Sequence, residues 1–133
     1  MNDEKQILSL VSRYCDCVHT QNEADFRALW TDTDANVLIS GQKKFNGLDS
    51  IYQDFLIDLI QQTYQSIDLI AETTEIHIMD ETHATVVFQY HTECIRRDNG
   101  EPFGIQGLET QLVVKQNGEW KLSHIHYSSA PRT

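Results

Sequence analysis

An acidic side chain and an amide interrupt a strand-like segment near the C-terminus. Residues 108–115 alternate in polarity, and this alternation places Glu109 and Gln111 on the same face as Val113. A carboxylate on a buried sheet face is costly unless it is paired, protonated or solvated by a cavity. A cavity beside Glu109 accounts for it most simply. The alternative is a bulge that shifts the strand pairing and leaves Glu109 in water at the rim of the sheet.

Two histidines lie two residues apart in the last strand-like segment. At strand spacing, His124 and His126 share one face about 7 Å apart, which is near enough for one divalent metal to bind both imidazoles. A third ligand, such as Glu109 or His91, would have to come from a neighbouring strand. The alternative is a packed, hydrogen-bonded pair without a metal.

The cysteines do not form a ligand set. Cys15 and Cys17 lie in a helix-like segment, where a separation of two residues turns the thiols roughly 200° apart. This geometry suits neither a disulfide nor a shared metal. We expect reduced, half-buried thiols without a function.

The polar residues of the C-terminal region are positioned by a predicted hairpin. Strands at 108–115 and 120–128 flank Asn117-Gly118, and Asn-Gly supplies the two positive φ values of a type I′ turn. Alternation divides the second strand into two faces, which carry Trp120, Leu122, His124, His126 and Ser128 on one side and Lys121, Ser123, Ile125 and Tyr127 on the other.

Helices dominate the first half of the sequence. Asp3 and Gln6 form a capping pair before a stripe of apolar residues at helical spacing, and Tyr14 lies on that stripe. Asn22 and Asp25 cap a second, shorter helix. The expected elements are helices at 3–20, at about 22–30 and at 51–62, with short strands at 35–40 and around Phe45.

The second half of the sequence reads as strand after strand. Strands are expected at 67–79, at 84–96 and from Phe103 onward. In the first of them the apolar residues are odd-numbered at Ile67 and even-numbered at Ile76, so we expect a bulge or a bend. Three helices followed by bent antiparallel strands predict an α+β fold, with the helices on the concave face of a strongly curved sheet.

Length and charge limit the possible partners. The 133 residues suit one domain. Ten Lys and Arg against 20 Asp and Glu give a net charge of −10, which repels both nucleic acid and anionic lipid. We see neither a signal sequence nor a membrane span, and we expect a soluble, cytoplasmic protein.

The order of the elements and several short motifs resemble the nuclear transport factor 2-like superfamily, which includes ketosteroid isomerase, scytalone dehydratase and the SnoaL-like polyketide cyclases. The similarity covers essentially the whole of residues 1–133. The association (hub) domain of calcium/calmodulin-dependent protein kinase is the most similar, through Ile76-His77-Ile78-Met79, Asn117-Gly118-Glu119-Trp120, His124-Ile125-His126 and Ser128-Ser129-Ala130-Pro131. The resemblance implies a cone-shaped cavity between helices and sheet, and a homodimer formed through the outer sheet face. It also implies that the histidine pair is structural, so we predict no metal and no cofactor.

The functional residues of these families are only partly present. The oxyanion tyrosine of the isomerase, in an Arg-Tyr context on the first helix, matches Tyr14, and its acidic oxyanion donor matches Glu109. The position of its catalytic base falls on Ile39, which cannot transfer a proton. The cavity arginines of the hub domain are replaced here by Tyr90, Gln111 and Tyr127.

Two functional hypotheses follow. The first is a small-molecule-binding or assembly module with a largely apolar cavity, whose partners are a second copy of the chain and a small apolar ligand. The second is a cofactor-free isomerase, cyclase or dehydratase in which Tyr14 and Glu109 stabilise an enolate of a hydrophobic substrate. The missing base favours the first. The residues expected to contact a ligand are Tyr14, Trp30, Phe55, Leu59, Phe88, Tyr90, Glu109, Gln111 and Tyr127.

Overall fold

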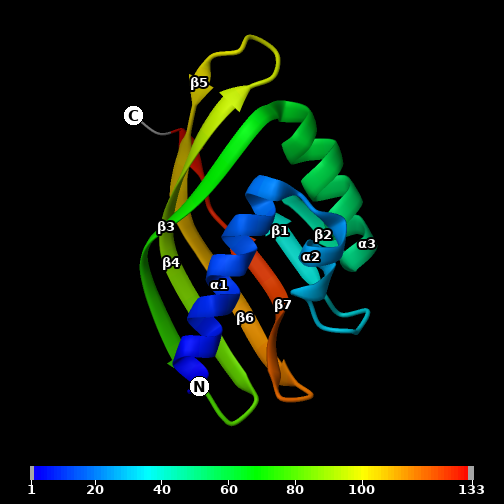
Figure 1. Ribbon diagram of the computed structural model, residues 1–133, viewed down its shortest axis with the longest axis vertical. Coiled ribbons are helices and arrows are strands. Elements are labelled where there is room, and N and C mark those ends of the chain that lie inside the picture. The colour runs from blue at the N-terminus through cyan, green and yellow to red at the C-terminus, as the bar shows by residue number, and fades with distance from the viewer. Residues whose placement is uncertain (1, 132–133) are drawn as a thin grey trace.

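The computed structural model describes residues 2–131 and shows helices packed on one face of a strongly curved sheet (Figure 1). This arrangement confirms the predicted α+β fold. The elements in chain order are α1 (Asp3–Thr20), α2 (Glu23–Ala28), β1 (Val37–Ser40), β2 (Lys43–Asn46), α3 (Leu48–Ser50), the π-helix η1 (Ile51–Gln61), β3 (Tyr64–Ile78), β4 (His83–Arg96), β5 (Pro102–Phe103), β6 (Ile105–Gln116), β7 (Glu119–Tyr127) and β8 (Ala130–Pro131).

The sheet is mostly antiparallel. Its strand order is β2-β1-β7-β6-β4-β3, with β5 paired to β4 and β8 paired to β6. The β1–β7 pair is parallel. Alternation along β4 and β6 sends one set of side chains toward the helices and the other to the outer face of the sheet.

The predicted C-terminal hairpin is present. Asn117 and Gly118 have φ values of 52° and 79°, as a type I′ turn requires, and Lys115 lies opposite Trp120 across it. The bulge expected in the long strand is also present, between Ala71 and Thr73 of β3.

A bulge in the β6–β7 pair makes our prediction for the last strand wrong. Leu112 lies opposite His124 and Val113 lies opposite Leu122, so Ser123 has no partner in the register. The extra residue reverses the alternation beyond Leu122. As a result Ile125 is fully buried, whereas His126 is exposed. The histidines therefore do not share a face with Trp120 and Leu122.

Helix α1 has the predicted bounds, but its N-cap lies one residue earlier than predicted. Asn2, rather than Asp3, is the N-cap, and its side chain accepts a hydrogen bond of 2.8 Å from the backbone N–H of Lys5. The Asp3 carboxylate instead accepts hydrogen bonds of 3.1 Å from Lys115 Nζ and Trp120 Nε1. Asp3 thus connects the start of α1 to the closing hairpin. The second helix is capped by Asn22, as predicted.

The third predicted helix is a π-helix over most of its length, not an α-helix. A side-chain hydrogen bond of 2.9 Å joins Gln53 and Asp58, five residues apart, which is the spacing of π-helical turns. The inward-facing residues Ile51, Phe55 and Ile60 are four and five residues apart. Such spacing fits either kind of helix, so the sequence pattern alone does not separate them.

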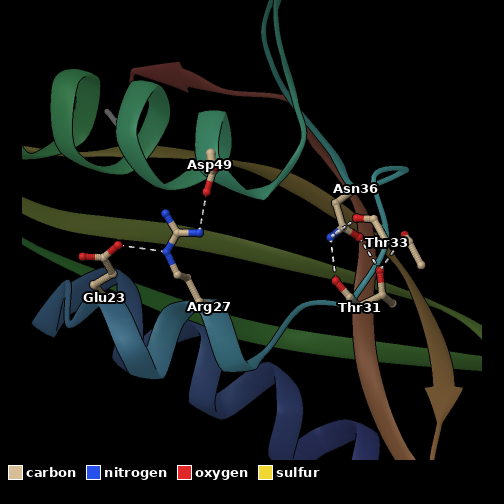
Figure 2. Close-up of polar contacts among 6 residues, drawn as sticks. All are labelled: Glu23, Arg27, Thr31, Thr33, Asn36 and Asp49. Carbon is tan, nitrogen blue, oxygen red and sulfur yellow. Dashed lines mark hydrogen bonds and ion pairs between the residues drawn. The ribbon is translucent and has the colours of Figure 1, made fainter.

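The loop that leads from α2 into β1 is held by a buried asparagine (Figure 2). Asn36 is fully buried, and its Nδ2 donates to the backbone oxygens of Thr31 at 2.9 Å and Thr33 at 3.3 Å. Its Oδ1 accepts a hydrogen bond from the Thr31 hydroxyl. In the same view Arg27 of α2 bonds to Glu23 and to Asp49 of α3, which fixes α2 against the following helix.

We predict that Asn36→Ala lowers the free energy of unfolding by about 2 kcal/mol, because the substitution leaves the buried partners of the amide without hydrogen bonds. Urea denaturation measures the change. Asn46→Ala, at an exposed position on β2, is the matched control and should change stability by less than about 0.5 kcal/mol. Equal unfolding midpoints for the two variants would contradict the role assigned to Asn36.

Candidate functional site

A pocket of about 350 Å³ lies between the helices and the concave face of the sheet. This volume is at the lower end of the range for small-molecule sites. Helices α1 and η1, the ends of β3 and β4, strand β5, and strands β6 and β7 all contribute to its wall. The lining residues are Tyr14, Val18, Ser40, Phe55, Leu59, Ile60, Thr63, Tyr64, Ile67, Leu69, Tyr90, Thr92, Arg96, Phe103, Ile105, Glu109, Tyr127 and Ser129.

The structure brings most of the predicted ligand-contacting residues to this pocket. Aromatic rings form much of its wall, with the ring centroids of Tyr90 and Tyr127 at 6.0 Å and those of Phe55 and Tyr127 at 6.1 Å. The predicted residues that line it are Tyr14, Phe55, Leu59, Tyr90, Glu109 and Tyr127.

Trp30, Phe88 and Gln111, which were also predicted to contact a ligand, do not line the pocket. Trp30 packs on Phe26 of α2, with ring centroids 6.1 Å apart, and fills the other end of the space beneath the helices. Phe88 is buried on the same face of β4 as Tyr90, but it lies two residues further along the strand and does not reach the pocket. Gln111 lies behind Glu109 and contacts it directly.

Sequence reasoning also missed residues at one end of the pocket. Thr92 and Arg96 line it, and both lie on the same alternating face of β4 as Tyr90. Alternation along residues 84–96 would therefore have identified them. Tyr64 and Phe103 also line this end, but their place follows from the pairing of β3 and β5 with β4, which no local pattern shows.

The most unusual group in the pocket is the carboxyl of Glu109. Glu109 is 2% exposed, and its Oε2 accepts a hydrogen bond of 2.8 Å from Gln111 Nε2. Burial raises the pKa of Glu109 to about 8, and the hydrogen bond from Gln111 opposes this shift only in part. The carboxyl is consequently protonated at neutral pH and can donate a hydrogen bond.

The carboxamide of Gln111 is only partly hydrogen-bonded. Gln111 Oε1 is buried, and no group in residues 2–131 donates a hydrogen bond to it. Buried acceptors are rarely left without a donor. A neutral Glu109 has one proton to donate, and this oxygen and a ligand oxygen would compete for it.

Three tyrosines lie near Glu109. The Tyr90 hydroxyl donates to the backbone oxygen of Ser128 at 2.7 Å, so it is already engaged. Within the described chain, no group is hydrogen-bonded to the Tyr14 hydroxyl. Burial, followed by the charge of Glu109, raises the pKa of Tyr14 well above the usual value, so this phenol stays neutral and is a hydrogen-bond donor. Tyr14 and Glu109 are therefore two hydrogen-bond donors in the wall of the same pocket.

The remaining chemical candidates lie elsewhere. The bulge at Ser123 turns the partly buried His124 and the exposed His126 to the outer face of the sheet. His91 is also on that face, 3.4 Å from the carboxylates of Glu72 and Glu93. Across residues 2–131, no three His, Cys, Asp or Glu side chains are grouped to hold a metal ion.

The cysteines are free thiols. Cys17 and Cys94 are buried and Cys15 is partly buried. Burial raises the pKa of Cys15 to about 12, which leaves its thiol protonated and a poor nucleophile.

The described part of the chain contains no helix that is long and apolar enough to cross a membrane.

Comparison with known proteins identifies the family. Residues 1–126 match the SnoaL-like domain. No curated protein matches the sequence. Among solved structures, a nuclear transport factor 2 (NTF2-like) superfamily protein from Salmonella enterica serovar Typhimurium LT2 is 24% identical, with a TM-score of 0.89 over 97% of this chain and 92% of that one.

Two further structures share the fold. The hexachlorocyclohexane dehydrochlorinase LinA-type3 from Novosphingobium barchaimii LL02 is 13% identical, with a TM-score of 0.84 over 98% of this chain and 90% of that one. A candidate calcium/calmodulin dependent protein kinase II association domain from Xanthomonas campestris is 15% identical, with a TM-score of 0.82 over 100% of this chain and 91% of that one. The chain belongs to the SnoaL-like domain family, as its sequence resemblance predicted, and it shares the fold of an NTF2-like superfamily protein.

Proposed function

We propose that the protein binds a small, largely apolar ligand that carries one hydrogen-bond-accepting oxygen. The observation that carries this proposal is a buried carboxyl, Glu109, whose pKa burial raises to about 8, in a pocket lined mainly by aromatic and aliphatic side chains. The ligand oxygen accepts hydrogen bonds from Tyr14 and Glu109. Above about pH 8, where Glu109 is ionised, a ligand with a negative charge at this position is repelled.

An acid–base enzyme is the second candidate. A hydroxyl and a neutral carboxyl that converge on one oxygen are suited to stabilise an enolate, and the structural neighbours include a dehydrochlorinase. Proton abstraction from carbon needs a base as well. Glu109 is the one carboxyl among the described residues that line the pocket, and neither histidine nor lysine lines it. We therefore propose binding without turnover.

Removal of the Tyr14 hydroxyl should separate recognition of an oxygen from general apolar binding. We predict that Tyr14→Phe weakens the binding of a cyclic ketone about tenfold, the value of one buried hydrogen bond. Its affinity for the hydrocarbon of the same shape should stay within about twofold. Isothermal titration calorimetry measures both affinities.

Tyr52→Phe is the matched control for this experiment, since Tyr52 packs on Phe26 with ring centroids 6.2 Å apart and does not line the pocket. The control should bind both probes as the wild type does. Failure of the wild type to bind either probe would refute the proposed function. A ketone that binds no better than the hydrocarbon would refute the role of the donors.

We also propose that the protein forms a homodimer through the outer face of the sheet. Leu108 of β6 is 51% exposed on this face, beside the half-buried Val87 and Leu112. Only the opposite face packs against the helices, so apolar side chains on the outer face favour association with a second copy. The fold shared with a candidate association domain supports the same proposal.

We predict that Leu108→Asp weakens self-association at least tenfold, because the substitution puts a charge into an apolar interface. Analytical ultracentrifugation measures the change. Leu8→Asp is the control, since Leu8 is 47% exposed on α1, away from the outer sheet face. A wild-type monomer at micromolar concentration would contradict the proposed dimer.

The cysteines support a proposal for the cellular location. Free thiols at Cys15, Cys17 and Cys94 are usual in proteins of reducing compartments. We therefore propose a cytoplasmic location.

A further inference from the structure

The end of the pocket opposite Glu109 carries a positive charge. Arg96, the last residue of β4, is the one cation among the described lining residues. Its side chain is 33% exposed, so it reaches both the pocket and the solvent. Glu109, in contrast, is buried at the inner end. The two ends of one pocket therefore differ in charge and in access to water.

Aromatic rings and a carboxylate hold the Arg96 guanidinium in a defined orientation. It lies over the Phe103 ring, 5.2 Å from the centroid, and Phe103 stacks on Tyr64 at 6.3 Å with an interplanar angle of 18°. Its Nε and Nη2 donate to the two oxygens of Asp98 at 3.1 and 3.0 Å. This forked arrangement is the one in which a guanidinium binds a carboxylate.

Asp98 is a partner that a ligand can replace at little cost. Its side chain is 65% exposed, and exposed ion pairs contribute little to stability. A carboxylate at the outer end of a ligand already held in the pocket has a high effective concentration at Arg96. Because the chain has a net charge of −10, a negatively charged ligand needs such a local cation.

We propose that the ligand is an oxo- or hydroxy-carboxylic acid with an apolar middle. Its inner oxygen accepts hydrogen bonds from Tyr14 and Glu109, its carbon chain lies against the aromatic wall, and its carboxylate binds Arg96 in place of Asp98. The inference rests on the proposed function and adds the second recognition point. A small anion without the apolar chain can bind Arg96, but it does not reach Tyr14 and Glu109 at the same time.

A series of oxo-carboxylic acids of increasing chain length, each compared with its methyl ester, tests the inference by calorimetry. At one chain length the acid should bind about tenfold tighter than its ester, the value of one charge-assisted hydrogen-bonded contact. Arg96→Gln should abolish this difference. Asp98→Asn should increase the affinity for the acid about threefold or more, since it removes the competing carboxylate.

Arg27→Gln is the matched control. Arg27 also binds carboxylates, those of Glu23 and Asp49, and lies 5.2 Å from the centroid of an aromatic ring, that of Tyr52, but it does not line the pocket. This variant should keep the preference for the acid. The affinity for the ester reports whether each variant retains an intact pocket.

The outcomes distinguish this inference from the proposed function. Equal binding of acid and ester at every chain length, or a preference that survives in Arg96→Gln, would overturn the role of Arg96 while ester binding still supported the pocket. Failure of acids and esters alike to bind would overturn both. An acid preference lost in Arg96→Gln, enhanced in Asp98→Asn and retained in Arg27→Gln is the expected result.

Discussion

Glu109→Gln is expected to raise the free energy of unfolding at pH 8 by on the order of 4 kcal/mol and to leave it nearly unchanged at pH 4. The pKa of Glu109 is raised to about 8 by burial in the folded protein, whereas in the unfolded chain it has the ordinary value of about 4.3. Between these two values the folded state binds one more proton than the unfolded state. Stability therefore decreases as the pH rises through this window. Glutamine has no proton to lose, so the variant lacks this decrease.

Urea denaturation of both proteins between pH 4 and pH 9 provides the measurement. The two stability curves should coincide at the acidic end, diverge above about pH 4.5 and run parallel again above about pH 8. Glu81→Gln, on an exposed turn, is the control and should follow the wild type throughout. Parallel curves for wild type and Glu109→Gln over the whole range would show that Glu109 is ionised in the folded protein.

Trp120→Ala should lower the free energy of unfolding by about 3 to 5 kcal/mol, the usual cost of removing a buried aromatic side chain. Trp120 is 3% exposed at the start of β7, and its Nε1 donates to Asp3 at 3.1 Å. The substitution removes both the apolar contact and the connection between the hairpin and α1.

Trp120→Phe separates these two contributions. Phenylalanine keeps most of the buried surface and loses the hydrogen bond, so we expect a loss of about 1 to 2 kcal/mol. Chemical denaturation of the two variants measures the difference. An unchanged midpoint for Trp120→Ala would place this side chain outside the core and contradict the register of β7.

Local sequence signals predicted the parts of the fold that they determine. Asn117-Gly118 identified the closing turn because few other pairs tolerate two positive φ values. The bulge in β3 was predictable because the apolar residues change phase around it. The bulge at Ser123 was missed although the apolar residues change from even-numbered, at Trp120 and Leu122, to odd-numbered, at Ile125 and Tyr127, which is the same signal as in β3.

The pocket was less predictable than the sheet. Alternation identifies the face of a side chain but not its position along the concave surface, which is why Phe88 and Tyr90 share a face and only Tyr90 lines the pocket. Trp30 was misplaced because α2 fills the space beside it with Phe26. Glu109 is buried and lines the pocket, and its position on an apolar sheet face is what led us to expect a cavity, because a carboxyl there is costly without a cavity, a partner or a proton.

Titration of the Glu109 side-chain carboxyl by ¹³C NMR, assigned by the resonance that Glu109→Gln lacks, tests the central claim most directly. A buried, neutral carboxyl in the pocket predicts a protonated group at pH 7 and a midpoint near pH 8. A midpoint near the ordinary glutamate value of about 4.3 would contradict it.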